Sequence, residues 1–144
     1  MIRNGSAVWN GTLKEGTGTI STPSTVLNNT PYSFKLRFEN EDGKAGTNPE
    51  ELIAAAHAGC FSMAFSGQLT TAGFTPTSIS TNAALTMEKT DAGMTITKIH
   101  LTMSAVIPGI TEAQFQELAG NAKAGCPVSR VLNAEITLAA TLSA

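Results

Sequence analysis

The chain has 144 residues, which suits one domain with a substantial core and leaves little room for a second. Its net charge of −2 at pH 7 argues against a nucleic-acid-binding or membrane-surface protein. Charged residues make up only 14% of the chain, against roughly 25% in typical soluble domains, so we expect a subunit interface to cover part of its surface.

The N-terminal third predicts three short strands joined by loops. Residues 6–13 and 17–22 are predicted strands on either side of a glycine turn, and the polar stretch that follows them is a predicted loop. Residues 31–39 alternate strictly between apolar and polar side chains, which is the period of a half-buried strand. Arg37 falls on the polar face of that predicted strand.

A long helix is predicted to follow a loop at residues 41–46. Asn48 can cap it, Pro49 suits its first position, and Glu51 stands three residues after the cap. The helix should run to about Thr71 and end near Gly73. Because this segment is poor in charge and rich in Ala, Gly and Ser, we expect it to be buried on most sides.

A hairpin is predicted next, from residues 79–89, a turn at residues 91–93 and a long strand at residues 94–107. The apolar parity of the second strand changes between Ile96 and Ile99, which predicts a bulge there.

The C-terminal part predicts a second helix and a last strand. Thr111 and Gln114 form a capping box, Gly125 ends the helix, and Pro127 begins a short further turn. Alternation from Ile136 onward predicts the strand. The order is β-β-β-α-β-β-α-β, which predicts a single α+β domain over residues 1–144, with a mostly antiparallel sheet and two main helices.

Targeting and membrane signals are not apparent. Residues 1–11 hold no apolar core of a signal peptide, and the longest apolar stretch, residues 52–65, is shorter than the ~20 residues of a membrane span. We therefore expect a cytoplasmic protein without a membrane partner. Its two cysteines, Cys60 and Cys126, should then be free thiols unless they are catalytic or redox-sensing.

The two cysteines lie far apart in the sequence, and the chain has no CxxC motif, which argues against a zinc site of the usual spacing. Cys60 lies in the middle of the long helix, where packing is the ordinary role of a cysteine. Cys126 stands between Gly125 and Pro127, at a corner that would expose and hold its thiol, although core packing explains it equally well. Together they form a candidate pair of peroxidatic and resolving thiols.

Four further residues have both a plain and a functional interpretation. Arg37 is either a solvated charge or the positive charge that an activated thiolate needs. Glu50 and Glu51 are explained by the helix dipole alone. His57, three residues before Cys60, suggests a cysteine hydrolase, but one helix provides no nucleophile elbow or oxyanion hole, so we favour a structural or tuning role.

Two cysteine motifs carry a family resemblance. Residues 46–63 (GTNPEELIAAAHAGCFSM) and 122–129 (AKAGCPVS) resemble the OsmC/Ohr family of thiol peroxidases, and the similarity covers nearly the whole chain. His57 and the FSM triplet after Cys60 are more similar to the osmotically inducible branch than to the organic hydroperoxide resistance branch, which usually has Tyr at the position of His57.

The resemblance implies an OsmC-like fold, an intertwined homodimer, and active sites at the subunit interface. It implies that Cys60 attacks the peroxide and Cys126 resolves the product. The Arg and Glu of the family motifs fall on Arg37 and Glu50, with Glu51 as the alternative. Ten residues of helix place Glu50 about 15 Å from Cys60, so we expect Glu50 to reach the site from the partner chain.

The resemblance thus implies a thiol-dependent peroxidase that serves oxidative and osmotic stress defence. It would reduce organic hydroperoxides, and hydrogen peroxide less well, to alcohols through a Cys60 sulfenic acid and a Cys60–Cys126 disulfide. An external dithiol, of dihydrolipoyl type by resemblance, would reduce the disulfide again. Apolar neighbours should favour organic substrates, namely Leu52, Ile53, Phe61 and Phe65.

No metal, flavin or nucleotide motif is present, so we expect no cofactor. Two other functions stay open: a non-enzymatic ligand-binding dimer of the same fold with inert thiols, and a cysteine hydrolase that uses Cys60 and His57.

Overall fold

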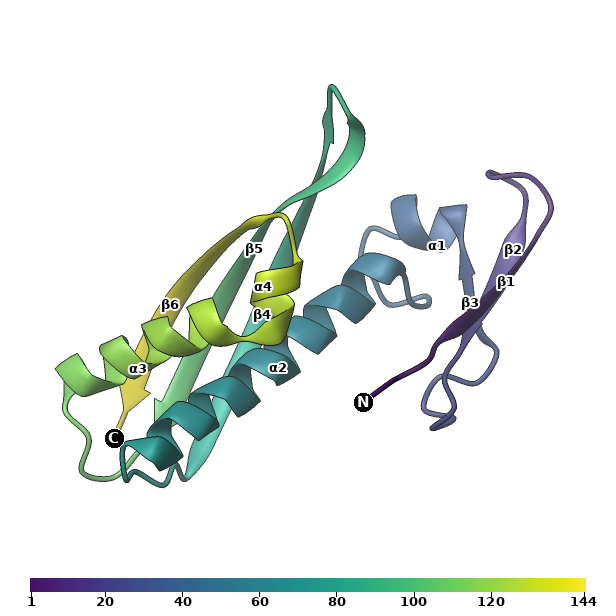
Figure 1. Ribbon diagram of the computed structural model, residues 1–144. Coiled ribbons are helices and arrows are strands. Elements are labelled where there is room, and N and C mark those ends of the chain that lie inside the picture. The colour runs from purple at the N-terminus through teal and green to yellow at the C-terminus, as the bar shows by residue number, and fades with distance from the viewer. The chain divides into compact units, whose positions relative to one another are not determined.

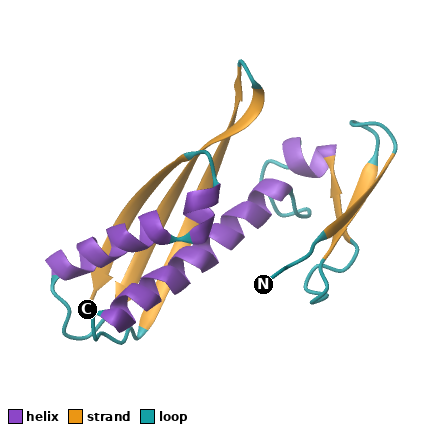
Figure 2. Cartoon of the chain, viewed as in Figure 1, coloured by secondary structure: helices purple, strands orange, loops and turns teal.

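The structure is a computed structural model that describes residues 1–144. The chain divides into two compact units, Met1–Leu52 and Ile53–Ala144. Four helices and two three-stranded sheets give an α+β fold, as predicted (Figures 1 and 2). In chain order the elements are β1 (Ser6–Asn10), β2 (Thr17–Ser21), β3 (Thr30–Ser33), α1 (Phe34–Phe38), α2 (Pro49–Thr71), β4 (Ser78–Thr90), β5 (Gly93–Val106), α3 (Glu112–Gly125), α4 (Pro127–Val131) and β6 (Glu135–Ser143).

The first unit is built on the antiparallel sheet β1-β2-β3. Trp9, Gly18 and Tyr32 occupy one row across its three strands. The two rings meet with centroids 5.3 Å apart, and a Cβ on Gly18 would lie only 2.5 Å from the Tyr32 ring. Gly18 therefore gives the aromatic pair the space to close over the middle strand.

Residues 31–39 do not form one strand, so that prediction is wrong. β3 ends at Ser33, whose side chain accepts a hydrogen bond from the Leu36 backbone N–H at 3.1 Å and caps α1. Phe34 and Phe38 then lie one turn apart, with ring centroids 4.8 Å apart and ring planes tilted by 45°. Because a spacing of four residues suits one face of a strand and one face of a helix, the apolar pattern did not distinguish them. Arg37 consequently lies on a helix.

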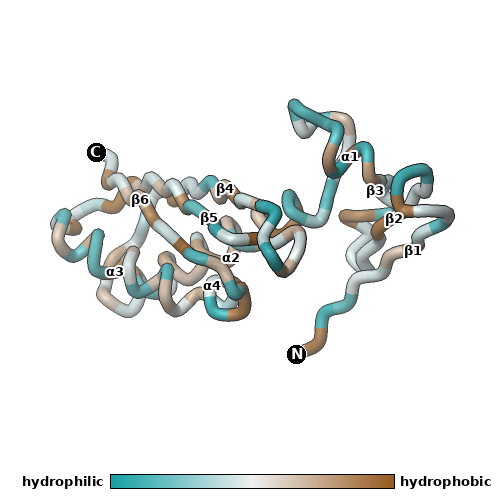
Figure 3. Tube along the Cα trace, turned by 90° about the horizontal axis from the view of Figure 1, so that it is seen from above, coloured by the Kyte–Doolittle hydropathy of each residue, from teal (hydrophilic) through white to brown (hydrophobic).

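The second unit has two layers. One is the sheet β4-β5-β6, antiparallel between β4 and β5 and parallel between β5 and β6. The other consists of α2 and α3, which lie side by side on one face of that sheet (Figures 1 and 3). The parallel pair arises because α3 and α4 carry the chain back across the sheet before β6 begins.

The predicted bulge in β5 is confirmed. Thr86 pairs with Lys98 but Met87 pairs with Ile96, which leaves Thr97 as the extra residue. The shift changes which residues of β5 face the helices, so the apolar side chains before and after the bulge can both point to the core.

The core of the second unit follows one stripe of α2. Phe61, Phe65 and Leu69 are fully buried at intervals of four residues, and Phe65 meets the edge of Phe115 on α3 with ring centroids 5.6 Å apart. Each such side chain contributes about 1.5–3 kcal/mol when it leaves water. Packing along this stripe therefore fixes α2 against α3 and β5.

The other faces of α2 are not buried within this chain, contrary to our expectation. Only four of its residues are buried, and Met63 is 79% exposed. α2 is long and apolar enough to cross a membrane by length and composition alone. Core helices of soluble proteins pass the same test, and here the apolar stripe packs on the unit's own sheet.

The predicted helix ends are confirmed. The Asn48 carboxamide oxygen accepts a hydrogen bond from the Glu51 backbone N–H at 2.8 Å at the start of α2. Thr111 and Gln114 form the capping box of α3, which ends at Gly125.

Replacing Thr111 with Ala should lower the free energy of unfolding by about 1 kcal/mol, because the Gln114 backbone N–H loses the hydroxyl oxygen that accepts its hydrogen bond. Thermal unfolding at fixed protein concentration should show a midpoint lower by roughly 2–4 °C. Thr111→Ser keeps the hydroxyl and should unfold like the wild type. Equal loss in both variants would contradict the capping role.

Candidate functional site

Two free thiols meet where α2 passes the corner between α3 and α4. The sulfurs of Cys60 and Cys126 lie 3.0 Å apart, although the residues are 66 positions apart in the sequence. Cys60 is in the middle of α2, and Cys126 donates its backbone N–H to the Ala122 carbonyl at 2.9 Å, just past the end of α3. The fold thus brings the two predicted thiols within reach of each other.

The two thiols differ in exposure. Cys126 is fully buried in the core cluster, whereas Cys60 is partly exposed. Of the two interpretations of Cys126 from the sequence, core packing is confirmed and exposure at the corner is not, because the chain turns there with its side chain toward α2. A molecule that arrives from solvent therefore reaches Cys60 first.

The protonation of the pair follows from its donors. Burial raises the pKa of the Cys60 thiol, and its hydrogen bond to Cys126 raises it further. Burial alone would also raise the pKa of Cys126, but donation from Cys60, from the Ser129 and Val128 backbone N–H groups and from the Ser129 hydroxyl lowers it overall. Either sulfur can donate across the 3.0 Å contact, and we assign the proton to Cys60 because Cys126 has the additional donors.

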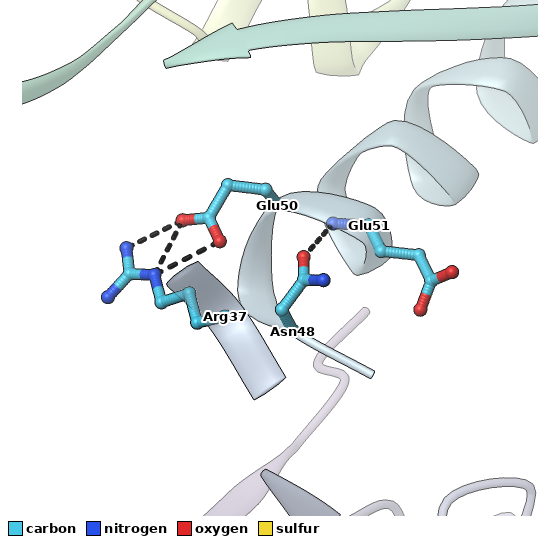
Figure 4. A network of polar contacts seen from close by, with 4 residues as sticks. All are labelled: Arg37, Asn48, Glu50 and Glu51. Atoms are coloured by element: carbon cyan, nitrogen blue, oxygen red, sulfur yellow. Dashed lines mark hydrogen bonds and ion pairs between the residues drawn. The ribbon is translucent and has the colours of Figure 1, made fainter. Parts of the chain in front are cut away.

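The predicted charged residues pair inside the first unit. The Arg37 guanidinium donates to both carboxylate oxygens of Glu50, with Nη2 to Oε1 at 2.6 Å and Nε to Oε2 at 3.0 Å (Figure 4). Glu51 instead accepts a hydrogen bond from the Thr47 hydroxyl at 2.8 Å. Within the chain, the partner of Arg37 is therefore Glu50 and not Glu51. A bidentate salt bridge of this kind holds the guanidinium in one orientation.

An apolar cavity of about 280 Å³ lies beside Arg37 in the first unit. Sequence reasoning placed Phe61 and Phe65 in the substrate surroundings, but both are fully buried in the core. The sequence did not predict the aromatic residues of α1 and the first sheet as cavity walls, because residues 31–39 were predicted to form one strand. The cavity is lined by Trp9, Leu13, Tyr32, Ser33, Phe34, Arg37, Phe38 and Pro49.

His57 is fully buried and does not serve Cys60. Its Nε2 lies 2.7 Å from the Ser129 hydroxyl oxygen, and its Nδ1 has no hydrogen-bond partner. Burial lowers the pKa of His57, so the imidazole is neutral at pH 7. A cysteine hydrolase needs its imidazole on the nucleophile, and this geometry does not provide it.

The site residues form no metal centre. No group of three or more His, Cys, Asp or Glu side chains in residues 1–144 is arranged to hold a metal ion. What the geometry offers is thiol chemistry at Cys60 and Cys126 and a fixed cation at Arg37.

Comparison with known proteins places the sequence among close relatives. The chain is 57% identical over 136 residues to a protein named Peroxiredoxin OsmC from Escherichia coli (strain K12). The aligned region covers 94% of this chain and 93% of that protein. The Shigella flexneri protein of the same name matches equally well.

Solved structures share the fold. An OsmC-like protein from Mycoplasma pneumoniae superposes with a TM-score of 0.75 at 16% identity, over 100% of this chain and 99% of that one. The organic hydroperoxide resistance protein OhrB of Bacillus subtilis superposes with a TM-score of 0.63 at 25% identity, over 97% and 98% of the two chains. The sequence profile of OsmC-like proteins matches residues 41–141. Together with the two close relatives, this match shows that the chain belongs to the OsmC-like protein family.

Proposed function

We propose that this protein is a thiol-dependent peroxidase that reduces organic hydroperoxides, and hydrogen peroxide less well, to alcohols in oxidative and osmotic stress defence. The observation that carries the proposal is the 3.0 Å approach of two free thiols, one partly exposed and one buried. The 57% identity to proteins named Peroxiredoxin OsmC supports the same activity.

In the first step the Cys60 thiolate attacks the distal oxygen of the hydroperoxide. The O–O bond breaks, the alkoxide leaves and takes up a proton to become the alcohol, and Cys60 becomes a sulfenic acid. Burial and the contact with Cys126 oppose ionisation of Cys60. A cation has to offset both, and Arg37, oriented by Glu50, supplies it.

The cation reaches Cys60 from a second copy of the chain. Glu50 and Cys60 lie on the same helix α2, about 15 Å apart along its axis, so the Arg37–Glu50 pair cannot serve the Cys60 of its own helix. A homodimer with sites at its interface resolves this separation. Two features support it: the low charge of the chain, and the small residues around Met63 that α2 leaves uncovered.

In the second step Cys126 displaces the hydroxyl of the sulfenic acid and forms the disulfide with Cys60. An external dithiol then reduces the disulfide by exchange, and a dihydrolipoyl group is the candidate reductant. In this proposal residues 1–144 form a single OsmC-like domain, and we assign the protein to the cytoplasm.

The substrate's organic group is the natural occupant of the cavity beside Arg37. Its walls are mainly aromatic, and Arg37 is the charged residue among those that line it. Such a site favours an alkyl or aryl hydroperoxide over hydrogen peroxide, which has no apolar part to bury.

Replacing Cys126 with Ser should separate the two steps. The wild type should lose two titratable thiols per chain when it receives one equivalent of an organic hydroperoxide, without a crosslink between chains. Cys126→Ser should lose one thiol and stop as a Cys60 sulfenic acid, which mass spectrometry after dimedone trapping detects. Full turnover of Cys126→Ser with a dithiol would refute the resolving role. A wild type that loses no thiols would indicate a binding protein.

Replacing Arg37 with Ala should slow the peroxide step roughly tenfold to a thousandfold, because a nearby opposite charge shifts a pKa by about 1–3 units. Stopped-flow measurement of peroxide consumption under single-turnover conditions reports this rate. Lys35→Ala removes an exposed cation from the same helix and should leave the rate unchanged. An unchanged rate in Arg37→Ala would make Arg37 an ordinary surface charge.

Mixed dimers should show which chain supplies Arg37. Cys60→Ser should be inactive alone and Arg37→Ala should keep only its slowed residual rate. Subunit exchange should restore about a quarter of the wild-type sites, because half the dimers are mixed and each holds one complete site. Activity after exchange is measured per chain. If exchange, verified by native mass spectrometry, restores nothing, Arg37 acts on the Cys60 of its own chain.

A further inference from the structure

Two contacts of the same spacing join α2 to the corner before β6. On α2, His57 precedes Cys60 by three residues, and at the corner Ser129 follows Cys126 by three. Cys60 meets Cys126 at 3.0 Å, and His57 Nε2 meets the Ser129 hydroxyl oxygen at 2.7 Å. Because residues three apart lie on one helical face, the two contacts lie next to each other.

The proton on His57 follows from its partners. The ring is fully buried, and only Nε2 has a hydrogen-bond partner. A buried N–H without an acceptor is costlier than a lone pair without a donor, so the neutral ring carries its proton on Nε2 and donates it to Ser129. The Ser129 oxygen therefore accepts, and its own proton is free to point elsewhere. Ser129 stands one helical turn after Cys126, and its hydroxyl lowers the pKa of the Cys126 thiol, as expected of a donor to that sulfur.

We propose that His57 and Ser129 are positioning residues for the disulfide-forming step: His57 fixes the Ser129 hydroxyl, and that hydroxyl donates to Cys126 and holds its sulfur as the nucleophile that attacks oxidised Cys60. This assignment rests on the proposed function, because it concerns the second step of that reaction. Because His57 is fully buried and its ring contacts Ser129 and not Cys60, we assign neither residue a part in the first step.

The step is balanced without a further reactant. The Cys126 thiolate forms an S–S bond with the sulfenic sulfur of Cys60, and the S–O bond breaks. The oxygen leaves with the bonding electron pair as hydroxide and takes up a proton, which replaces the one that Cys126 released on ionising. The Cys126 sulfur is oxidised and the Cys60 sulfur is reduced.

No charged side chain near Cys126 takes the place of Ser129 as a donor to its sulfur. From α2, Cys60 and the neutral His57 face the corner. Of the cations on the neighbouring helices, Lys123 of α3 is partly exposed and Arg130 of α4 is exposed, so both point at least partly to water. Apart from the Cys60 thiol, the donors to the buried sulfur are uncharged groups of Val128 and Ser129.

Single-turnover trapping tests the assignment. Reduced protein is mixed with one equivalent of tert-butyl hydroperoxide and quenched with dimedone at increasing times, and mass spectrometry follows the Cys60 adduct and the disulfide. In Ser129→Ala, disulfide formation should slow roughly threefold to tenfold: a tenfold smaller thiolate fraction is partly offset by a more nucleophilic sulfur. The rate of peroxide consumption should not change.

Conservative variants separate chemistry from packing. Ser129→Thr keeps the hydroxyl, and His57→Gln keeps an N–H at similar reach, so both should form the disulfide at nearly the wild-type rate, while His57→Leu should resemble Ser129→Ala. Ser62→Ala is the matched control, because it removes from α2 a serine hydroxyl that contacts Thr81 at 2.8 Å. It should form the disulfide normally.

A second readout is the pKa of the lone Cys126 thiol in a Cys60→Ser background, measured by thiolate absorbance. Adding Ser129→Ala should raise it by about one unit. The proposal is overturned if Ser129→Ala changes neither this pKa nor the rate of disulfide formation. An adduct that forms on Cys126 instead of Cys60 would overturn the proposed function itself, and the two failures are therefore distinguishable.

Discussion

The packing of one stripe of α2 against α3 and β5 determines the rest of the second unit. Phe61 follows Cys60 directly in sequence, and Phe65 locks against Phe115 of α3. Once these rings are buried, the end of α3 has a fixed place beside α2, and Cys126 is the first residue after that end. The distance between the two sulfurs is thus a consequence of hydrophobic packing, and no bond between them is needed to maintain it.

Packing brings the two thiols together within one unit, whereas the charged pair of the proposed reaction lies in the other unit. The thiols lie in the second unit among uncharged donors, which lower the pKa of Cys126 but leave that of Cys60 raised. The cation that the first step needs is held in the first unit by Glu50, at the start of the same helix. A single chain therefore contains every residue of the proposed reaction, and in the proposed mechanism the cation comes from a second copy of the chain.

Local signals predicted most of this fold. The caps at Asn48 and Thr111, and the parity change that marks the bulge at Thr97, depend on neighbouring residues and were read correctly from the sequence. Residues 31–39 were not, because Phe34 and Phe38 satisfy both periods and only the cap at Ser33 distinguishes them. Within the site, the family motifs identified the thiols and the ion pair. The contact between His57 and Ser129 spans 72 positions, and no local pattern records such a pairing.

The short sulfur–sulfur distance also bears on how the molecule changes shape during turnover. A disulfide measures about 2.05 Å, so closing the bond from 3.0 Å requires the sulfurs to move by only about 1 Å in total. Side-chain rotation can supply such a shift, and α2 and α3 need not unwind. The oxidised and reduced proteins should then have nearly the same outline. A binding partner could then distinguish the oxidised from the reduced protein only by direct contact with the sulfurs. This is what we expect of an enzyme that removes peroxide and not of a protein that signals its presence.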